Sequence, residues 1–132
     1  MNLQELIQKS KEDLRLSDEL DRDAQDLPRR KAQWSEWLSL FAVAYKKADW
    51  KYRKIKKDRY EFYLIGYNVT LDKRDIRETY LPGDDEVIEA AKSLELLKQK
   101  IELCERTISA LNRMGFDIKN VIDYRKLMSG IV

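Results

Sequence analysis

The chain is 132 residues long and carries 26 lysines and arginines against 24 aspartates and glutamates, with no histidine and one cysteine. The lack of histidine excludes the usual general acid or base at neutral pH and the Ser–His and Cys–His nucleophile systems. A single cysteine excludes an internal disulfide and the usual Cys/His zinc site. With 4 glycines and 2 prolines, the composition favours an all-α domain without metal or cofactor.

The first predicted element is an N-terminal helical segment over residues 1–28. Its apolar residues fall on one helical face as far as Leu16. Ser17 or Asp18 is a candidate cap for a continuation, and Pro28 is expected to interrupt the helix or to restart it.

A long basic and aromatic helix is predicted over residues 29–65, a stretch without glycine or proline. Its apolar positions alternate in steps of four and three, which gives a 3.5-residue period over four heptads. The stripe consists of Trp34, Leu38, Phe41, Tyr45, Ala48, Tyr52, Ile55, Arg59 and Phe62. A helix of about 35 residues is about 50 Å long, so it requires partner helices from the C-terminal half of the chain or from other subunits. Arg59 is a charged residue at a position of the apolar stripe. Either the stripe ends there, or Arg59 is placed for a ligand or an intersubunit partner.

Basic side chains are concentrated in this helix, because residues 46–59 carry a net charge of +6 while the segments 1–30 and 84–132 are mildly acidic. Cations beside aromatic rings suit single-stranded nucleic acid, since they neutralise phosphates while unstacked bases lie on the rings for about 1–3 kcal/mol each. The candidate residues are Lys51, Arg53, Lys54, Lys56, Lys57 and Arg59, with Trp50 and Tyr60 as stacking candidates off the stripe. The alternative is a solvated basic face whose neighbouring aromatics pack between helices.

Residues 66–83 are predicted to form a loop or a small hairpin. The stretch 67–71 has a strand-like composition, and Leu81–Asp84 reads as a turn that leads into a helix with acidic residues in its first turn. That helix is expected to end at Met114, with Gly115 as the residue after its C-cap. Phe116 and Asp117 then begin a short C-terminal helix.

Two stretches of this chain resemble the UvsY family, the recombination mediator proteins of T-even-type phages. The first is Lys57-Asp58-Arg59-Tyr60-Glu61-Phe62-Tyr63, which is similar to that family's basic-then-aromatic motif for single-stranded DNA. The second comprises Cys104, Ala110-Leu111, the run Arg113-Met114-Gly115-Phe116-Asp117-Ile118-Lys119-Asn120-Val121-Ile122-Asp123, and Arg125. The resemblance covers roughly residues 30 to 126, whereas the stretch 67–80 is shorter and less glycine-rich than the family pattern.

The resemblance implies a ring-like homo-oligomer, a hexamer or heptamer, that binds single-stranded DNA in the cytoplasm of the infected bacterial host. Such proteins help to load a RecA-like phage recombinase onto strands coated by the phage single-strand DNA-binding protein, in recombination, repair and replication. Lys57 and Arg59 would be the DNA-contacting pair. The C-terminal region 84–132 would carry the self-association, and its predicted interface residues are Leu94, Leu97, Ile101, Ile108, Leu111, Phe116, Ile118, Val121 and Ile122.

Two other classes of function are considered. A helical oligomeric adaptor that binds protein only would leave the basic face solvated, and sedimentation with and without an oligonucleotide separates it from a DNA-binding protein. An enzyme is disfavoured, since the acidic run Asp84-Asp85-Glu86 is ordinary for a helix start and Cys104 lies on the apolar stripe as a core residue. No apolar run approaches the ~20 residues of a membrane span, and we expect no signal peptide.

Overall fold

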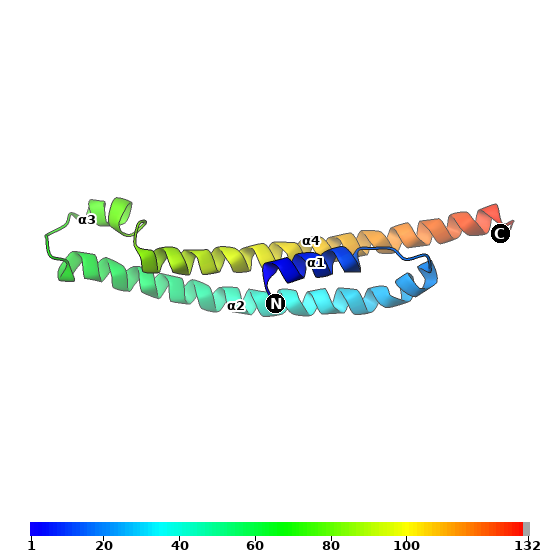
Figure 1. Ribbon diagram of the computed structural model, residues 1–132, viewed down its shortest axis with the longest axis horizontal. Helices are drawn as coiled ribbons and strands as arrows, with labels where there is room; N and C mark the ends of the chain where they lie inside the picture. The colour runs from blue at the N-terminus through cyan, green and yellow to red at the C-terminus, as the bar shows by residue number, and fades with distance from the viewer. Residues whose placement is uncertain (131–132) are drawn as a thin grey trace. The chain divides into compact units, whose positions relative to one another are not determined.

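The computed structural model describes residues 1–130, in which all regular secondary structure is helical (Figure 1). This confirms the all-α prediction. The elements are α1 (Leu3–Asp13), α2 (Leu20–Glu61), the π-helical turn η1 (Phe62–Gly66), α3 (Lys73–Asp75), the π-helical turn η2 (Ile76–Tyr80) and α4 (Asp85–Met128). Since residues 66–83 form short helical turns joined by coil, the hairpin alternative is wrong. No helix within residues 1–130 is long and apolar enough to cross a membrane.

The chain folds as two compact units. The first unit contains residues 1–40 and those from 100 onward, and the second contains residues 41–99. Both long helices contribute to both units, so the partner helix that α2 requires comes from the chain's own C-terminal half.

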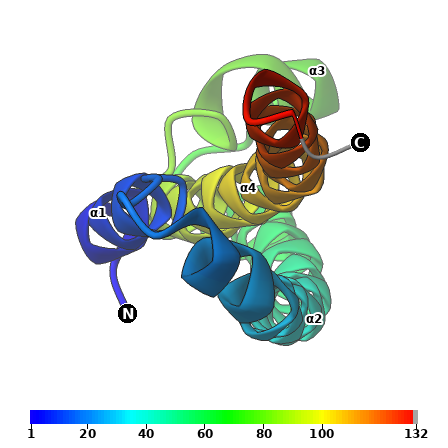
Figure 2. The same ribbon diagram turned by 90° about the vertical axis from the view of Figure 1, so that its right-hand side faces the viewer.

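The first unit is built on a core that α1, α2 and α4 share. Its buried apolar residues are Leu6, Leu20, Leu27, Trp34, Cys104, Leu111, Met114 and Ile118. Helix α1 begins with a capping box, in which the Asn2 side chain accepts a hydrogen bond from the Glu5 N–H at 2.8 Å. It lies against α4 (Figure 2). There the Ser10 and Thr107 hydroxyl oxygens are 2.7 Å apart. Burial raises the pKa of the Cys104 thiol to about 11, as expected for a core cysteine.

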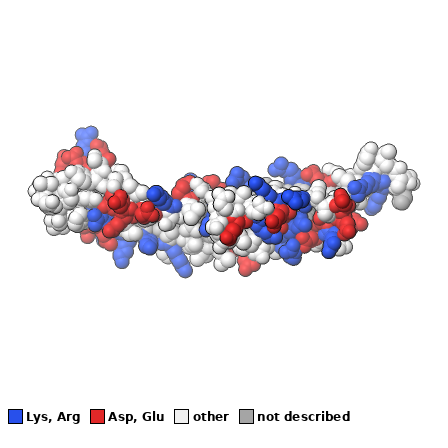
Figure 3. All heavy atoms as spheres, in the orientation of Figure 1, with Lys and Arg blue, Asp and Glu red and all other residues white. Residues whose placement is uncertain are grey.

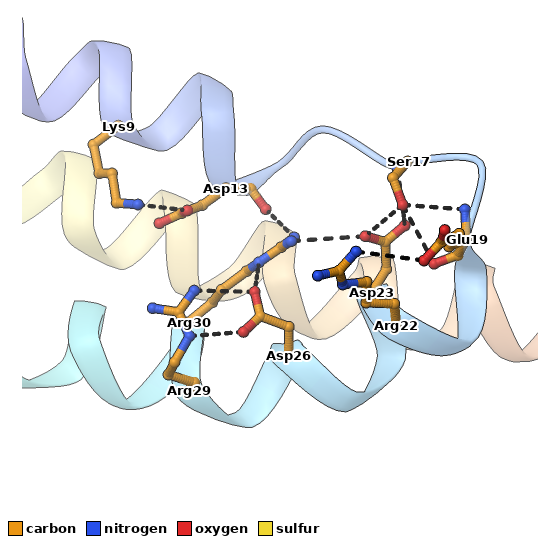
Figure 4. Close-up of polar contacts among 9 residues, drawn as sticks. All are labelled: Lys9, Asp13, Ser17, Glu19, Arg22, Asp23, Asp26, Arg29 and Arg30. Carbon is orange, nitrogen blue, oxygen red and sulfur yellow. Dashed lines mark hydrogen bonds and ion pairs between the residues drawn. The ribbon is translucent and has the colours of Figure 1, made fainter.

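Helix α2 runs through Pro28 without a break, so the prediction that this proline interrupts or restarts the helix is wrong. A proline inside a helix costs about 3 kcal/mol, and here a buried side chain and a polar network hold the helix on both sides of it. Leu27 is buried. Arg30 donates to the Asp26 carboxylate at 2.7 Å and to the Asp13 carbonyl at 2.9 Å (Figure 4).

The same network ties the connection between α1 and α2 to the start of α2. The Asp23 carboxylate accepts hydrogen bonds from the Ser17 N–H at 2.8 Å and from its hydroxyl at 3.0 Å (Figure 4). The hydrogen bonds from Arg29 and then Arg30 hold the pKa of Asp26 well below its usual value. These contacts position the first turns of α2 independently of Pro28.

Helix α4 is also continuous, so the predicted stop at Gly115 and the separate short C-terminal helix are wrong. Phe116 and Asp117 lie inside the helix. Gly115 sits where α4 meets α2, and a Cβ built there would lie 3.5 Å from the Leu27 Cδ1 atom. Buried Met114 and Ile118 flank the glycine, and their packing outweighs its cost of about 1 kcal/mol in a helix interior.

The core of the second unit brings the end of α2 together with the segment that leads into α4. It contains buried Tyr63, Ile76, Leu81 and Val87, and half-buried residues pack around them, namely Tyr52, Ile55, Tyr60, Tyr67, Leu71 and Tyr80. The Tyr63 ring centroid lies 5.5 Å from those of both Tyr67 and Tyr80. Within η1 the buried ring is that of Tyr63, while the stripe residue Phe62 is 40% exposed.

Candidate nucleic-acid interface

Arg59 is held by an acid of its own chain. Its Nε donates to the Asp84 carboxylate at 2.8 Å, and the Tyr63 hydroxyl donates to the same oxygen at 2.6 Å. Asp84 is 5% exposed, and its other oxygen accepts from the N–H groups of Glu86 and Val87, which caps α4. The charge in the apolar stripe is therefore explained by an intrachain ion pair, an arrangement that the sequence interpretation did not consider.

The electrostatics of this cluster favour its charged form. Burial raises the pKa of Asp84, but the hydrogen bonds from Tyr63, the Val87 N–H and Arg59 outweigh burial and hold that pKa below its usual value. The hydrogen bond to Asp84, together with burial, raises the pKa of Tyr63. The Arg59 guanidinium also lies 4.3 Å from the Phe62 ring centroid.

Next to this cluster is an open hollow of about 530 Å³, which we call the basic hollow. Its lining residues are Arg53, Lys56, Lys57, Tyr60, Arg77 and Leu81. The four from α2 follow the helical spacing i, i+3, i+4 and i+7, which places them on one face. The other two come from η2 and the turn after it. Four cations around one tyrosine and one leucine have the chemistry to neutralise phosphates beside a flat apolar patch.

The basic hollow brings together only some of the predicted DNA-binding residues. Lys54 and Trp50 lie on the adjoining face of α2 by helical spacing, and Trp50 is 65% exposed. Lys51 instead lines a separate hollow with Glu86 and Glu89. Arg59 does not line the basic hollow.

The predicted interface residues divide into three groups by exposure. Leu111 and Ile118 are buried in the first unit's own core. Half-buried side chains are those of Leu94, Leu97, Ile101, Ile108 and Ile122, while Phe116 is 70% and Val121 40% exposed. Tyr124, Leu127 and Met128 are also exposed, next to the cations Arg125 and Lys126 in the last turn of α4. Toward this end of the chain, Figure 3 shows uncharged residues beside a group of Lys and Arg side chains. Tyr124, Leu127 and Met128 extend the apolar surface beyond the predicted set.

Sequence reasoning missed two functional candidates, Arg77 and Asp84. Asp84 was predicted only as part of a helix start, although a charge at stripe position 59 was the signal that an acidic partner was required. Arg77 lies in the segment predicted as loop or hairpin, and no periodic pattern connects it to α2.

The fold and the basic hollow together define a helical protein equipped to bind a polyanion. The family model described as "Recombination, repair and ssDNA binding protein UvsY" matches residues 9–131, so the chain belongs to the UvsY family. It is therefore a recombination, repair and single-stranded-DNA-binding protein and no enzyme, which confirms the sequence resemblance.

Solved structures show the same fold. Two crystal structures of the bacteriophage T4 recombination mediator protein UvsY, in different lattice types, are similar to this chain. In lattice type II the TM-score is 0.88 at 20% identity, over 98% of each chain. In lattice type IV it is 0.89 at 21% identity, over 97% of this chain and 99% of that one. No curated protein sequence matches the chain significantly.

Proposed function

We propose that the chain loads a RecA-like phage recombinase onto single strands coated by the phage single-strand DNA-binding protein, in the cytoplasm of the infected bacterium. The observation that carries this proposal is the basic hollow of a UvsY-family chain. A surface that holds phosphates and stacks a base competes with the coat protein for the strand without doing chemistry on it.

We assign strand binding to the basic face of α2. Arg53, Lys56, Lys57 and Tyr60 line the basic hollow, and we place Lys51, Lys54 and Trp50 along the path of the strand beside it. Arg59 supports the site from its ion pair with Asp84. Single contacts of this kind are weak, so several copies acting on one strand raise the affinity by their effective concentration.

Self-association supplies those copies. We propose a ring-like homo-oligomer, a hexamer or heptamer, whose subunits meet through the apolar surface at the end of α4. Phe116, Val121, Tyr124, Leu127 and Met128 are each at least 40% exposed there. Exposed apolar residues gathered on one helix end mark an interaction surface in a protein of this size.

The loading activity is tested with the recombinase and the single-strand-binding protein encoded by the same phage. We expect the chain to shorten the lag before recombinase ATPase activity on precoated strands. The variant Lys56→Ala/Lys57→Ala should restore most of the lag, because each subunit then has two fewer cations to neutralise phosphates. The matched control Lys11→Ala/Lys98→Ala removes two exposed lysines outside the basic hollow and should act as wild type.

The assay also separates the mediator from a protein-only adaptor. An adaptor would act equally well with both double variants, since neither changes a protein-binding surface that the adaptor requires. A lag that the wild-type chain leaves unchanged would contradict the loading proposal.

A further inference from the structure

Arg77 faces the basic hollow from a part of the chain distant in sequence from the motif on α2. It lies in η2, between Ile76 and Leu81, which are 0% and 4% exposed. Because these two neighbours are fixed in the core of the second unit, the backbone that carries Arg77 is held against α2. Arg77 itself is exposed.

The two arginines near the site differ in what they are bound to. Arg59 is engaged by Asp84 at 2.8 Å, and its side chain is only 24% exposed. Within residues 1–130, no ion pair or hydrogen bond occupies the guanidinium of Arg77. The charge of Arg59 is already compensated by a buried carboxylate, so a phosphate gains less from binding it than from binding an arginine without such a partner.

We infer that Arg77 is a strand-binding residue, whose guanidinium holds a phosphate of single-stranded DNA in the basic hollow opposite Lys56 and Lys57. Arg59 is then a positioning residue, which fixes the end of α2 to the start of α4 through Asp84. This inference rests on the proposed strand binding by the basic face of α2. It adds a phosphate-binding group from the central segment, where the chain departs from the family pattern.

The geometry also assigns a place to the base. Tyr60 and Leu81 provide the apolar part of the basic hollow, and cations surround them from α2 on one side and from η2 on the other. A nucleotide held at its phosphate by Arg77 and the two lysines can lay its base on the tyrosine ring. A planar guanidinium suits this role because it donates two parallel hydrogen bonds to one phosphate.

The test is the binding of a fluorescein-labelled oligo(dT) to the full chain, measured by anisotropy over a range of salt concentrations. Arg77→Ala should weaken binding about tenfold at low salt, and the salt slope should fall by about 0.7 for each phosphate that is no longer neutralised. Arg77→Lys keeps the charge, and its affinity for oligo(dT) should lie between that of the wild-type chain and that of Arg77→Ala. The control is Arg74→Ala, a neighbour that pairs with Glu78 at 3.3 Å and lies outside the basic hollow.

The experiment distinguishes a failure of the role assigned to Arg77 from a failure of strand binding by α2. If Arg77→Ala binds like Arg74→Ala while Lys56→Ala/Lys57→Ala is impaired, the inference is overturned and the site on α2 stands. If the wild-type chain shows no salt-dependent binding, strand binding by α2 itself fails. Circular dichroism should give the same helicity and unfolding midpoint for Arg77→Ala and Arg74→Ala, and a lower midpoint for Arg77→Ala alone would overturn the inference in favour of a structural role.

Discussion

Replacing Trp34 with alanine should lower the free energy of unfolding by about 3–5 kcal/mol. Trp34 is 0% exposed, and its indole N–H donates to the Asp13 carboxylate at 2.8 Å. Its ring also meets that of Trp37 edge to face, with centroids 4.9 Å apart. The substitution therefore opens a cavity at the junction of α1 and α2, and removes a hydrogen-bond donor from a buried carboxylate. Urea unfolding followed by far-ultraviolet circular dichroism measures the difference.

Two further variants make this prediction specific. Trp34→Phe keeps most of the volume but removes the N–H group, and should cost about 1–2 kcal/mol. Trp50→Ala removes a tryptophan of the same helix that is 65% exposed, and should change stability by less than about 0.5 kcal/mol. Equal midpoints for Trp34→Ala and Trp50→Ala would show that the first unit is not organised around Trp34.

Replacing Asp84 with alanine should destabilise the second unit by about 2–4 kcal/mol. The substitution removes the cap of α4, the acceptor of the Tyr63 hydroxyl and the ion-pair partner of Arg59 together. The value lies below that of a fully buried pair because the Arg59 side chain retains access to water. The control Glu78→Ala breaks an exposed pair with Arg74 in the same unit and should cost less than about 0.5 kcal/mol.

The contribution of Asp84 to the free energy of unfolding should also depend on pH. Because the pKa of Asp84 is lower in the folded chain than in the unfolded one, its contribution is present above the unfolded pKa of about 3.9 and is lost as the pH falls through the lowered value. In Asp84→Asn this part of the acid destabilisation should be absent. An acid unfolding profile identical to wild type would contradict the assigned role of Asp84.

The long-range architecture could be predicted because it depends on a repeated local pattern. The apolar spacing from Trp34 to Ile55 predicts a long helix, independently of which helices pack against it. The absence of that spacing over residues 66–83 predicts the break between the two long helices. Helix ends were harder. Pro28 and Gly115 both carry the local signals of a helix break, but Leu27 packs beside Gly115, and Arg30, two residues after Pro28, donates a hydrogen bond to the Asp13 carbonyl of α1. These are tertiary interactions, which propensity does not contain.

In the candidate site, too, some features follow from local sequence spacing and others depend on tertiary contacts. Arg53, Lys56 and Lys57 lie on one helix, so their common face follows from spacing alone. The partner of Arg59 and the contribution of Arg77 depend on how the segment 66–83 folds back onto α2, through the core of Tyr63, Ile76 and Leu81. No pattern within that segment specifies this docking.

Binding of single-stranded DNA to the basic face of α2 underlies both the proposed loading activity and the role assigned to Arg77. The most direct test is the salt dependence of oligo(dT) binding by Lys56→Ala/Lys57→Ala, compared with the control Lys11→Ala/Lys98→Ala, which removes the same charge elsewhere. We predict that the first variant binds at least about tenfold more weakly at low salt, with a slope smaller by about 1.4 for each subunit that contacts the strand. The control should keep the wild-type line. If the plots of log affinity against log salt concentration superimpose for the two double variants, strand binding by the basic face of α2 is wrong.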